Sequence, residues 1–345
     1  MYTTTSRTLC VGTLLVSILL PAVAQGDAGD QDLDEDSFTV QEGDCDDGRS
    51  DTWPGAVEQC WDGQDQDCNG DADDACMYLG STRIELARRA GQNTYTVSYP
   101  SDSDETVAFL AVNQITEHSD DQCDYVTTMT DQGGSYQFTI ALEHCGYGHN
   151  NRTHAFEADA IVFARRGGPG GFTSFDLSSL PTLNNHRDQG SATVGTSDAT
   201  QDVPICSMYS ADGQGCAEAS WYCSVSQNNG ILDGEIYENY GESDTFNEAR
   251  YINLGLGNNL EISQQSFSCR SGNSYTLTHT VSTALGTDHA AFVLPMSWDT
   301  GNRKDHLSYE STCTLSGSIY TCDITCYGSG RSVSGQVLFV DGSFQ

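Results

Sequence analysis

The chain has 345 residues and a formal net charge of −35, because 49 Asp and Glu outnumber 14 Lys and Arg. Nucleic acids and anionic membrane surfaces are bound through basic patches, so this balance excludes both as partners. The acidic composition suits a protein that binds cations or that works in a saline medium.

The first 24 residues have the pattern of an export signal. Arg7 precedes an apolar run over residues 9–20, and residues 22–24 offer a small-x-small cleavage site. The run is shorter than the roughly 20 apolar residues that span a bilayer, and no second run follows it. We therefore expect residues 1–24 to be removed and the mature chain to be secreted or held at the cell surface, without a membrane span.

Residues 25–76 form an acidic segment with 18 Asp and Glu and one Arg. Like charge at this density keeps a chain expanded unless cations or disulfides compact it. Asp32, Asp34 and Asp36 occupy alternate positions, and in an extended loop such side chains turn to one side. Because a hard cation takes all-oxygen ligands, we predict that these three carboxylates bind one, with the Phe38 carbonyl as a fourth ligand.

The ligand that completes this shell is left open by the sequence. An EF-hand loop that began at Asp32 would place its bidentate Glu at position 43, which is Gly43 here, so the loop is not an EF-hand. Asp44, Asp46 and Asp47 are the candidates. The alternative interpretation is a solvated acidic linker without metal, which is common for acidic runs.

The residues that follow carry a family resemblance. In order they are Gly43-Asp44-Cys45-Asp46-Asp47, Pro54-Gly55-Ala56, Glu58, Cys60, Asp62-Gly63, Asp65, Asp67-Cys68, Gly70 and Asp73-Asp74. This pattern resembles the Asp/Cys-rich MopE-type metal-binding motif of exported bacterial proteins, over about residues 30–76 only. The resemblance implies metal binding and adds Asp62, Asp65 and Asp67 as candidate ligands. The family usually has Gly inside its first loop, where this chain has Glu35 and Ser37.

Oxygen ligands select Ca²⁺ or Mg²⁺ over copper or zinc, and of these we expect Ca²⁺ as the cofactor and no transition metal. The acidic segment contains no His, and the copper of the protein that names the family is therefore not carried over. Its cysteines lack the CxxC pairs of a zinc site, and disulfides are the usual state outside the cell. The four cysteines concerned are Cys45, Cys60, Cys68 and Cys76.

Beyond Cys76 the composition changes to short alternating runs rich in Thr, Ser, Tyr and Val, which predict an all-β fold. Two stretches repeat the same order of runs, at residues 77–166 and 250–345. The matched runs are Tyr95–Ser98 with Tyr275–Thr278, Val107–Val112 with Ala290–Leu294, Tyr136–Ile140 with Tyr320–Ile324, and Ala160–Ala164 with Gln336–Val340. Their size favours two Ig-like β-sandwiches. Residues 167–249 are either a third, diverged sandwich or an irregular insert, and a short helix fits residues 243–252.

Removal of the signal leaves 13 cysteines, which predict disulfides with one thiol left over. Equivalent positions in the two repeats suggest two pairs, and Cys322, which is then left over, suggests a third pair with Cys269. In the middle region, two of three cysteines are expected to pair. The suggested pairs are Cys123–Cys145, Cys313–Cys326 and Cys269–Cys322, and the three middle cysteines are Cys206, Cys216 and Cys223.

No motif of a hydrolase, nucleotide-binding enzyme or metalloprotease occurs in the sequence, so we expect a protein without catalytic activity. The first hypothesis is a calcium-binding structural or adhesion protein that binds an extracellular protein or glycan. A metal-sequestering surface protein, with copper or another transition metal as cargo, is the second hypothesis. The third is a secreted carbohydrate-binding or carbohydrate-active protein.

Overall fold

The computed structural model describes residues 31–74, 76–87, 92–116, 124–143, 155–167, 171–176, 189–196, 202–211, 220–228, 231–239, 248–255, 260–284, 286–299, 307–328 and 331–344. The chain divides into two compact units. The acidic unit comprises Met1–Ala56 and Gln66–Cys68, and the β unit comprises Val57–Asp65 and Asn69–Gln345. Each is described by itself below.

The β unit is built from three consecutive segments, each with six strands among the described residues. The first segment contains β1 (Cys76–Ala87), β2 (Gln92–Ser98), β3 (Glu105–Thr116), β4 (Asp124–Asp131), β5 (Ser135–Glu143) and β6 (Ala155–Arg166). The second contains β7 (Gly171–Asp176), β8 (Gln189–Thr196), β9 (Asp202–Ala211), β10 (Ser220–Asn228), β11 (Ile231–Asn239) and β12 (Glu248–Gly255). The third contains β13 (Leu260–Arg270), β14 (Ser274–Thr280), β15 (Asp288–Asp299), β16 (Leu307–Ser316), β17 (Ile319–Gly328) and β18 (Ser332–Gly342).

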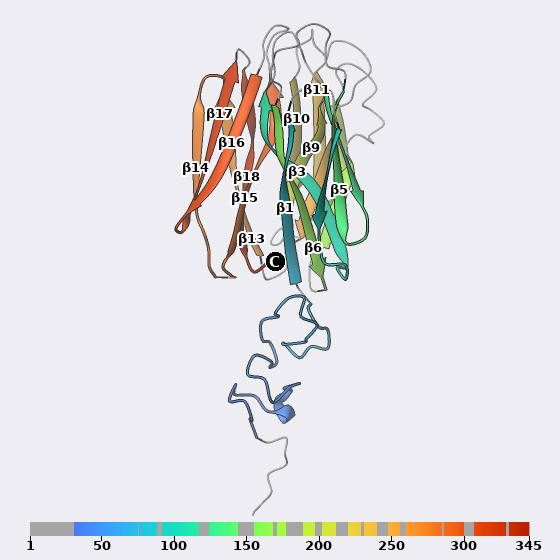
Figure 1. Cartoon of the computed structure of the whole chain (residues 1–345), viewed down its shortest axis with the longest axis vertical. Helices are drawn as coiled ribbons and strands as arrows, with labels where there is room; N and C mark the ends of the chain where they lie inside the picture. Colours follow the sequence, from blue (N-terminus) through green and yellow to red (C-terminus); the bar gives the residue numbers. More distant parts are fainter. Residues whose placement is uncertain are drawn as a thin grey trace, which may run out of the picture. The chain divides into compact units, whose positions relative to one another are not determined.

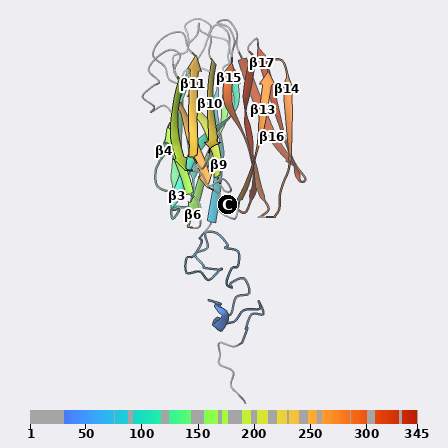
Figure 2. The ribbon, with the colours of Figure 1, turned by 180° about the vertical axis from the view of Figure 1, so that it is seen from behind.

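These strands form three six-stranded antiparallel sheets, and each sheet takes half of its strands from one segment and half from another (Figures 1 and 2). The strand orders are β1-β6-β3-β16-β17-β14, β13-β18-β15-β10-β11-β8 and β2-β5-β4-β9-β12-β7. In every sheet the first, sixth and third strands of one segment continue into the fourth, fifth and second strands of another. The prediction of an all-β fold is therefore confirmed, and the second segment has the same connectivity as its two neighbours.

A β-bulge at the same place in each segment explains how the sheets are shared. The extra residue is Asn113 in β3, Tyr209 in β9 and Met296 in β15. The residues directly after each bulge stay paired with the sixth strand of their own segment. On their other edge they pair with the fourth strand of another segment: β3 with β16, β9 with β4, and β15 with β10. A bulge bends its strand and increases the local twist, which redirects the strand end toward the neighbouring segment.

Equivalent apolar side chains from the three segments meet in one central core. Its fully buried members include Phe109 and Phe163, whose rings stack with centroids 6.0 Å apart. The equivalent set is Val107, Phe109, Ile161 and Phe163 in the first segment, Val203, Ile205, Ile252 and Leu254 in the second, and the partly buried Ala290 with Phe292, Leu338 and Val340 in the third. This core holds the three segments together by burial of apolar surface.

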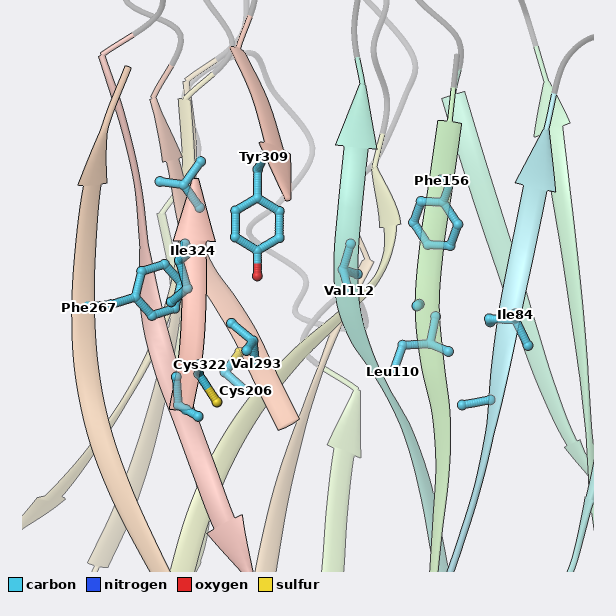
Figure 3. Close-up of a cluster of buried hydrophobic side chains, with 14 of the residues drawn as sticks. Ile84, Leu110, Val112, Phe156, Cys206, Phe267, Val293, Tyr309, Cys322 and Ile324 are labelled. Atoms are coloured by element: carbon cyan, nitrogen blue, oxygen red, sulfur yellow. The ribbon is translucent and has the colours of Figure 1, made fainter. Parts of the chain in front are cut away.

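The opposite face of the same strands packs into a second core (Figure 3). In β3, Leu110 and Val112 point away from Phe109 and join this cluster, as the alternation of side chains along a strand requires. Tyr309 of β16 is fully buried in it, and its ring stacks on Phe267 at a centroid distance of 6.4 Å. Because both faces of β3 are buried, residues 107–112 form a continuous apolar run in place of an alternating one.

A chain of side-chain hydrogen bonds reaches the backbone carbonyl of the bulge residue where β3 joins β16. The Tyr309 hydroxyl donates to Ser311 Oγ (3.0 Å), and Ser311 Oγ donates to the carbonyl of the bulge residue Asn113 (3.2 Å). Asn113 Nδ2 in turn donates to Asp159 (2.8 Å). Burial raises the pKa of the Tyr309 phenol far above its usual value, so the hydroxyl keeps its proton and remains a donor.

Among the described residues, disulfides join Cys45 to Cys68, Cys60 to Cys76, Cys206 to Cys223, Cys269 to Cys326, and Cys313 to Cys322. Two predicted pairings in the third segment, Cys313–Cys326 and Cys269–Cys322, are wrong. The hairpin register places Cys313 directly opposite Cys322, whereas Cys326 lies opposite Tyr309. The predicted pair Cys123–Cys145 and the middle residue Cys216 lie outside the described residues.

The short helix predicted for residues 243–252 is also wrong where the chain is described, because residues 248–252 belong to β12. This strand pairs with β9 on one side and with β7 on the other, and this pairing overrides the local helix propensity. In the part of the chain that the structure describes, no helix has the length and apolar character needed to span a bilayer.

Candidate metal centre

The loop over residues 32–38 is organised by its own aspartates. Asp32 accepts hydrogen bonds from the amides of Glu35 (2.7 Å, to Oδ1) and Ser37 (3.0 Å, to Oδ2). Asp34 and Asp36 each accept one from the amide two residues later, at 3.2 and 2.8 Å. These turns bring the three carboxylates together, with one oxygen of each lying within 4.8 Å of the others.

Three buried carboxylate oxygens in this region have no hydrogen-bond partner. They are the Oδ2 atoms of Asp34, Asp36 and Asp44, while the Oδ1 atom of each accepts a backbone amide. Asp44 is only 4% exposed. The charge of Asp44 raises the pKa of Asp34, and the charge of Asp36 raises the pKa of Asp44. A buried carboxylate oxygen without a partner is costly. The arrangement therefore needs a positive charge among these groups.

The pKa values of Asp34 and Asp44 also indicate that these carboxylates require a positive charge nearby. Burial raises the pKa of Asp44 above its usual value, and the charges of Asp36, Asp47 and Asp46 add to the increase, against one backbone hydrogen bond. For Asp34, burial again raises the pKa most, with further contributions from Asp36, Asp44 and Asp32. Both shifts mean that the ionised form is disfavoured until a cation compensates it.

Two residues of the loop adopt a backbone conformation that favours glycine. Glu35 has φ of 67° and Ser37 has φ of 87°, in the left-handed region. For a residue with a Cβ this conformation costs roughly 1–2 kcal/mol. These are the positions at which the resembled family usually has Gly. The hydrogen bonds that the Glu35 and Ser37 amides donate to Asp32 hold the loop in this conformation.

The other predicted ligands of the acidic unit have different surroundings. Phe38 donates its amide to Asp36, and its carbonyl remains a predicted ligand. Asp46 donates its amide to Asp44 Oδ1 (2.8 Å), and Asp47 Oδ1 accepts the amide of Leu33 (3.2 Å). Asp44 is therefore the residue that best completes the shell among the three candidates, because it alone of them has a buried carboxylate oxygen without a partner.

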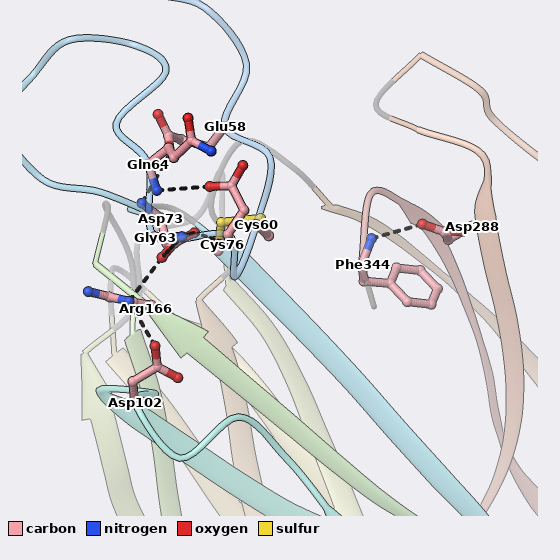
Figure 4. Close-up of a disulfide and its surroundings, with 11 residues drawn as sticks. Glu58, Cys60, Gly63, Gln64, Asp73, Cys76, Asp102, Arg166, Asp288 and Phe344 are labelled. Carbon is pink, nitrogen blue, oxygen red and sulfur yellow. Dashed lines mark hydrogen bonds and ion pairs between the residues drawn. A yellow bond between two sulfur atoms is a disulfide. The ribbon is translucent and has the colours of Figure 1, made fainter. Parts of the chain in front are cut away.

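In the β unit, the second half of the motif is anchored by Asp73, a buried aspartate that belongs to the sequence pattern but was not among the predicted ligands (Figure 4). Asp73 is 1% exposed and accepts the amides of Asp62 and Gly63 at 2.9–3.2 Å. Arg166, at the end of β6, donates to Asp73 (3.0 Å) and to Asp102 (2.8 Å). The Cys60–Cys76 disulfide ties the same loop to β1.

Two predicted ligands of this loop serve its turns. Asp62 Oδ1 accepts the amide of Gln64 (2.8 Å). Asp65 accepts the amides of Asn69 (3.1 Å) and Gly70 (2.8 Å) with its two oxygens. Asp67, the remaining predicted ligand, belongs to the acidic unit, where its carbonyl accepts the Gly55 amide (3.0 Å).

The donor set around Asp32, Asp34, Asp36 and Asp44 consists of oxygen atoms. All four cysteines of residues 25–76 are in disulfides, so they provide no thiolate for zinc or copper. Carboxylate oxygens of this kind suit a hard divalent cation such as Ca²⁺ or Mg²⁺. The residues present therefore fit an oxygen-ligated ion.

Comparison with known proteins agrees with the motif. Residues 44–74 match the Cu-binding MopE family, whose description is "Putative metal-binding motif". The match confirms the predicted resemblance for this part of the chain, and Asp44 is its first residue. No curated protein and no solved structure matches the chain.

Proposed function

We propose that the chain is a secreted or cell-surface calcium-binding protein, in which Ca²⁺ orders the acidic unit and the β unit has a structural or adhesive role without catalysis. One observation carries the proposal: Asp32, Asp34 and Asp36 each bring a carboxylate oxygen within 4.8 Å of the others, and Asp34, Asp36 and the nearby Asp44 each have a buried Oδ2 atom without a hydrogen-bond partner. A bound divalent cation removes the repulsion among these carboxylates. It stabilises the folded unit because the unfolded chain does not hold the ligands together.

Oxygen ligands support calcium over copper, although the matched family takes its name from copper binding. Copper sites in proteins are built from His, Cys and Met, and the described residues of the acidic unit contain no His or Met and only disulfide-bonded cysteines. Calcium accepts six to eight oxygens in flexible geometry, which suits a loop that supplies both side-chain and carbonyl oxygens.

An extracellular location is supported by the disulfides. Five disulfides occur among the described residues, and such bonds persist in oxidising compartments. Extracellular calcium-binding modules work at Kd values of about 10⁻⁴–10⁻³ M, where calcium is abundant and serves as a structural ion. We therefore expect weak to moderate affinity and a gain in resistance to proteases.

The test is calorimetric titration of the mature chain with Ca²⁺, Mg²⁺, Cu²⁺ and Zn²⁺. Asp44→Asn is expected to lose most of the Ca²⁺ heat. Asp323→Asn is the matched control, because it removes the same charge from an exposed position on β17, where Asp323 accepts a hydrogen bond from Thr276. Titrations in which neither wild-type calcium heat nor calcium protection from proteolysis appears would refute the proposal.

The family name favours one alternative, a surface protein that sequesters copper. Tight Cu²⁺ binding without any Ca²⁺ response would establish this alternative in place of ours. For the β unit, we propose an extracellular protein or glycan as the ligand. A glycan array with a parallel hydrolysis assay separates binding from catalysis.

A further inference from the structure

A disulfide stands directly beside the buried carboxylate of the candidate centre. Asp44 has a buried Oδ2 atom without a hydrogen-bond partner and lies near enough to Asp34 and Asp36 for their charges to interact, and the next residue, Cys45, is joined to Cys68. The Cys45 amide points at the Cys68 sulfur (3.1 Å), and the Asp44 amide donates to the Thr39 carbonyl (3.1 Å). The backbone at Asp44 is thus fixed on both sides, by a hydrogen bond and by a covalent link.

The same disulfide holds a distant piece of chain in the acidic unit. Residues 66–68 belong to this unit although they follow residues 57–65 of the β unit. The Trp53 amide donates to the Gln66 carbonyl (2.8 Å) and the Gly55 amide to the Asp67 carbonyl (3.0 Å). Gln66 is completely buried. The disulfide closes a loop with a sequence separation of 23 residues and makes this attachment permanent.

We infer that cation binding and the redox state of Cys45–Cys68 are linked, so that the acidic unit binds its cation more weakly once this disulfide is reduced. The inference rests on the proposed function. Asp44 is the coupling residue, since its backbone follows Cys45 and its carboxylate belongs to the cation cluster. The neighbouring disulfide Cys60–Cys76, which lies in the β unit, is not part of the link.

The redox step is an ordinary thiol–disulfide exchange with a dithiol such as dithiothreitol. A thiolate of the reductant attacks one sulfur, the bond between Cys45 and Cys68 breaks, and the second thiol of the reductant closes a cyclic disulfide. Two electrons and two protons pass to the protein, which gains two thiols. Reduction frees the backbone at residue 45 and releases residues 66–68 from their covalent attachment.

Linkage requires the effect to be reciprocal. If reduction weakens cation binding by a given factor, saturating cation makes reduction less favourable by the same factor. Coupling between sites commonly amounts to about 5–150-fold. We expect about tenfold here, which corresponds to roughly a 30 mV shift for this two-electron couple.

The experiment measures disulfide reduction in the mature chain equilibrated with defined ratios of reduced and oxidised dithiothreitol. Samples contain either saturating Ca²⁺ or a chelator, and free thiols are trapped by alkylation and assigned by peptide mass spectrometry. Each of the two disulfides is thus followed separately. The expected result is that Ca²⁺ raises the reductant ratio needed to open Cys45–Cys68 about tenfold and leaves Cys60–Cys76 unchanged.

The double variant Cys45→Ser with Cys68→Ser removes the disulfide and is the direct test of its effect on Ca²⁺ binding. Should that variant fail to fold, Asp44→Asn provides a second test. Asp44→Asn retains both disulfides and is expected to abolish the protection of Cys45–Cys68 by Ca²⁺. Equal protection of both disulfides, or calcium binding without protection of Cys45–Cys68, overturns the inference and leaves the proposed function standing. Absence of any calcium heat in the oxidised wild type overturns the proposed function itself.

Discussion

The shared central core predicts that a cavity in the first segment weakens all three segments. Phe109 of β3 is fully buried and stacks on Phe163 in the cluster to which all three segments contribute. Truncation of a buried Phe to Ala typically costs about 3–5 kcal/mol, through lost apolar burial and the cavity left behind. Against the roughly 5–15 kcal/mol by which proteins are stable, Phe109→Ala is a severe change.

The four tryptophans of the chain make the assay specific. Trp221 in β10 and Trp298 in β15 lie in the second and third segments, and the first segment has no Trp. With Trp53 and Trp61 replaced by Phe, fluorescence therefore reports only on the segments that do not carry the mutation. In a denaturant titration of Phe109→Ala followed by fluorescence, we expect the free energy of unfolding to fall by the full ~3–5 kcal/mol. The denaturant concentration at the midpoint falls accordingly, while the m value stays unchanged.

Independent sandwiches would behave differently. The fluorescence midpoint would then stay at its wild-type position, while circular dichroism would show a separate loss of about a third of the strands at lower denaturant. That pair of results would refute a shared core. Thr96→Ala, at an exposed position of the same segment, is the control and is expected to change stability by less than about 0.5 kcal/mol.

Three further predictions concern charge and covalent links. Because the pKa values of Asp34 and Asp44 are raised above 3.8, the metal-free acidic unit is expected to be most stable below that pH and to lose stability as the pH rises through the raised values. Calcium affinity is expected to rise over the same pH interval. Proteolysis in the presence of chelator measures the first trend, and calorimetry at several pH values measures the second. Asp341→Asn is expected to lower the thermal stability of the β unit by about 1–3 kcal/mol, since Asp341 is buried and bonded to His279 (2.7 Å) and His289 (2.8 Å). Replacement of both Cys206 and Cys223 by Ser is expected to cost about 3 kcal/mol in chemical denaturation, given their sequence separation of 17.

Much of the β unit follows from its sequence pattern. The four matched runs of the first and third segments fall on β2, β3, β5 and β6 and on β14, β15, β17 and β18, because strand periodicity and order are local properties. The sharing of sheets could not be derived in the same way. Only a few backbone pairs per junction, such as Tyr309 with Ile115, decide which segment a strand end joins. These pairs depend on bulges, which have no reliable local signal.

The disulfide error in the third segment had a readable cause. Residues 316–318 are Ser-Gly-Ser, and Gly317 adopts φ of 61° in a two-residue turn between β16 and β17. Gly at this place is a hairpin signal, and counting back from the turn sets Cys313 opposite Cys322. The proposed ligand role of Asp44 had no such signal. Spacing could not separate it from Asp46 and Asp47, and its burial arises from packing within the folded unit.

The burial pattern of β6 shows why the three segments form one folding unit. Ile161 and Val162 are adjacent and both fully buried, so the strand needs apolar partners on its two faces. Within the first segment, β2 and β5 cover only the face that carries Val162, while the face of Ile161 is covered by the second and third segments. An isolated first segment would expose Phe109, Ile161 and Phe163, at about 1.5–3 kcal/mol each. Together these losses amount to about 4.5–9 kcal/mol, which is a large part of the roughly 5–15 kcal/mol by which domains are stable. The shared core therefore makes folding of the β unit cooperative across all three segments, whatever their divergence in sequence.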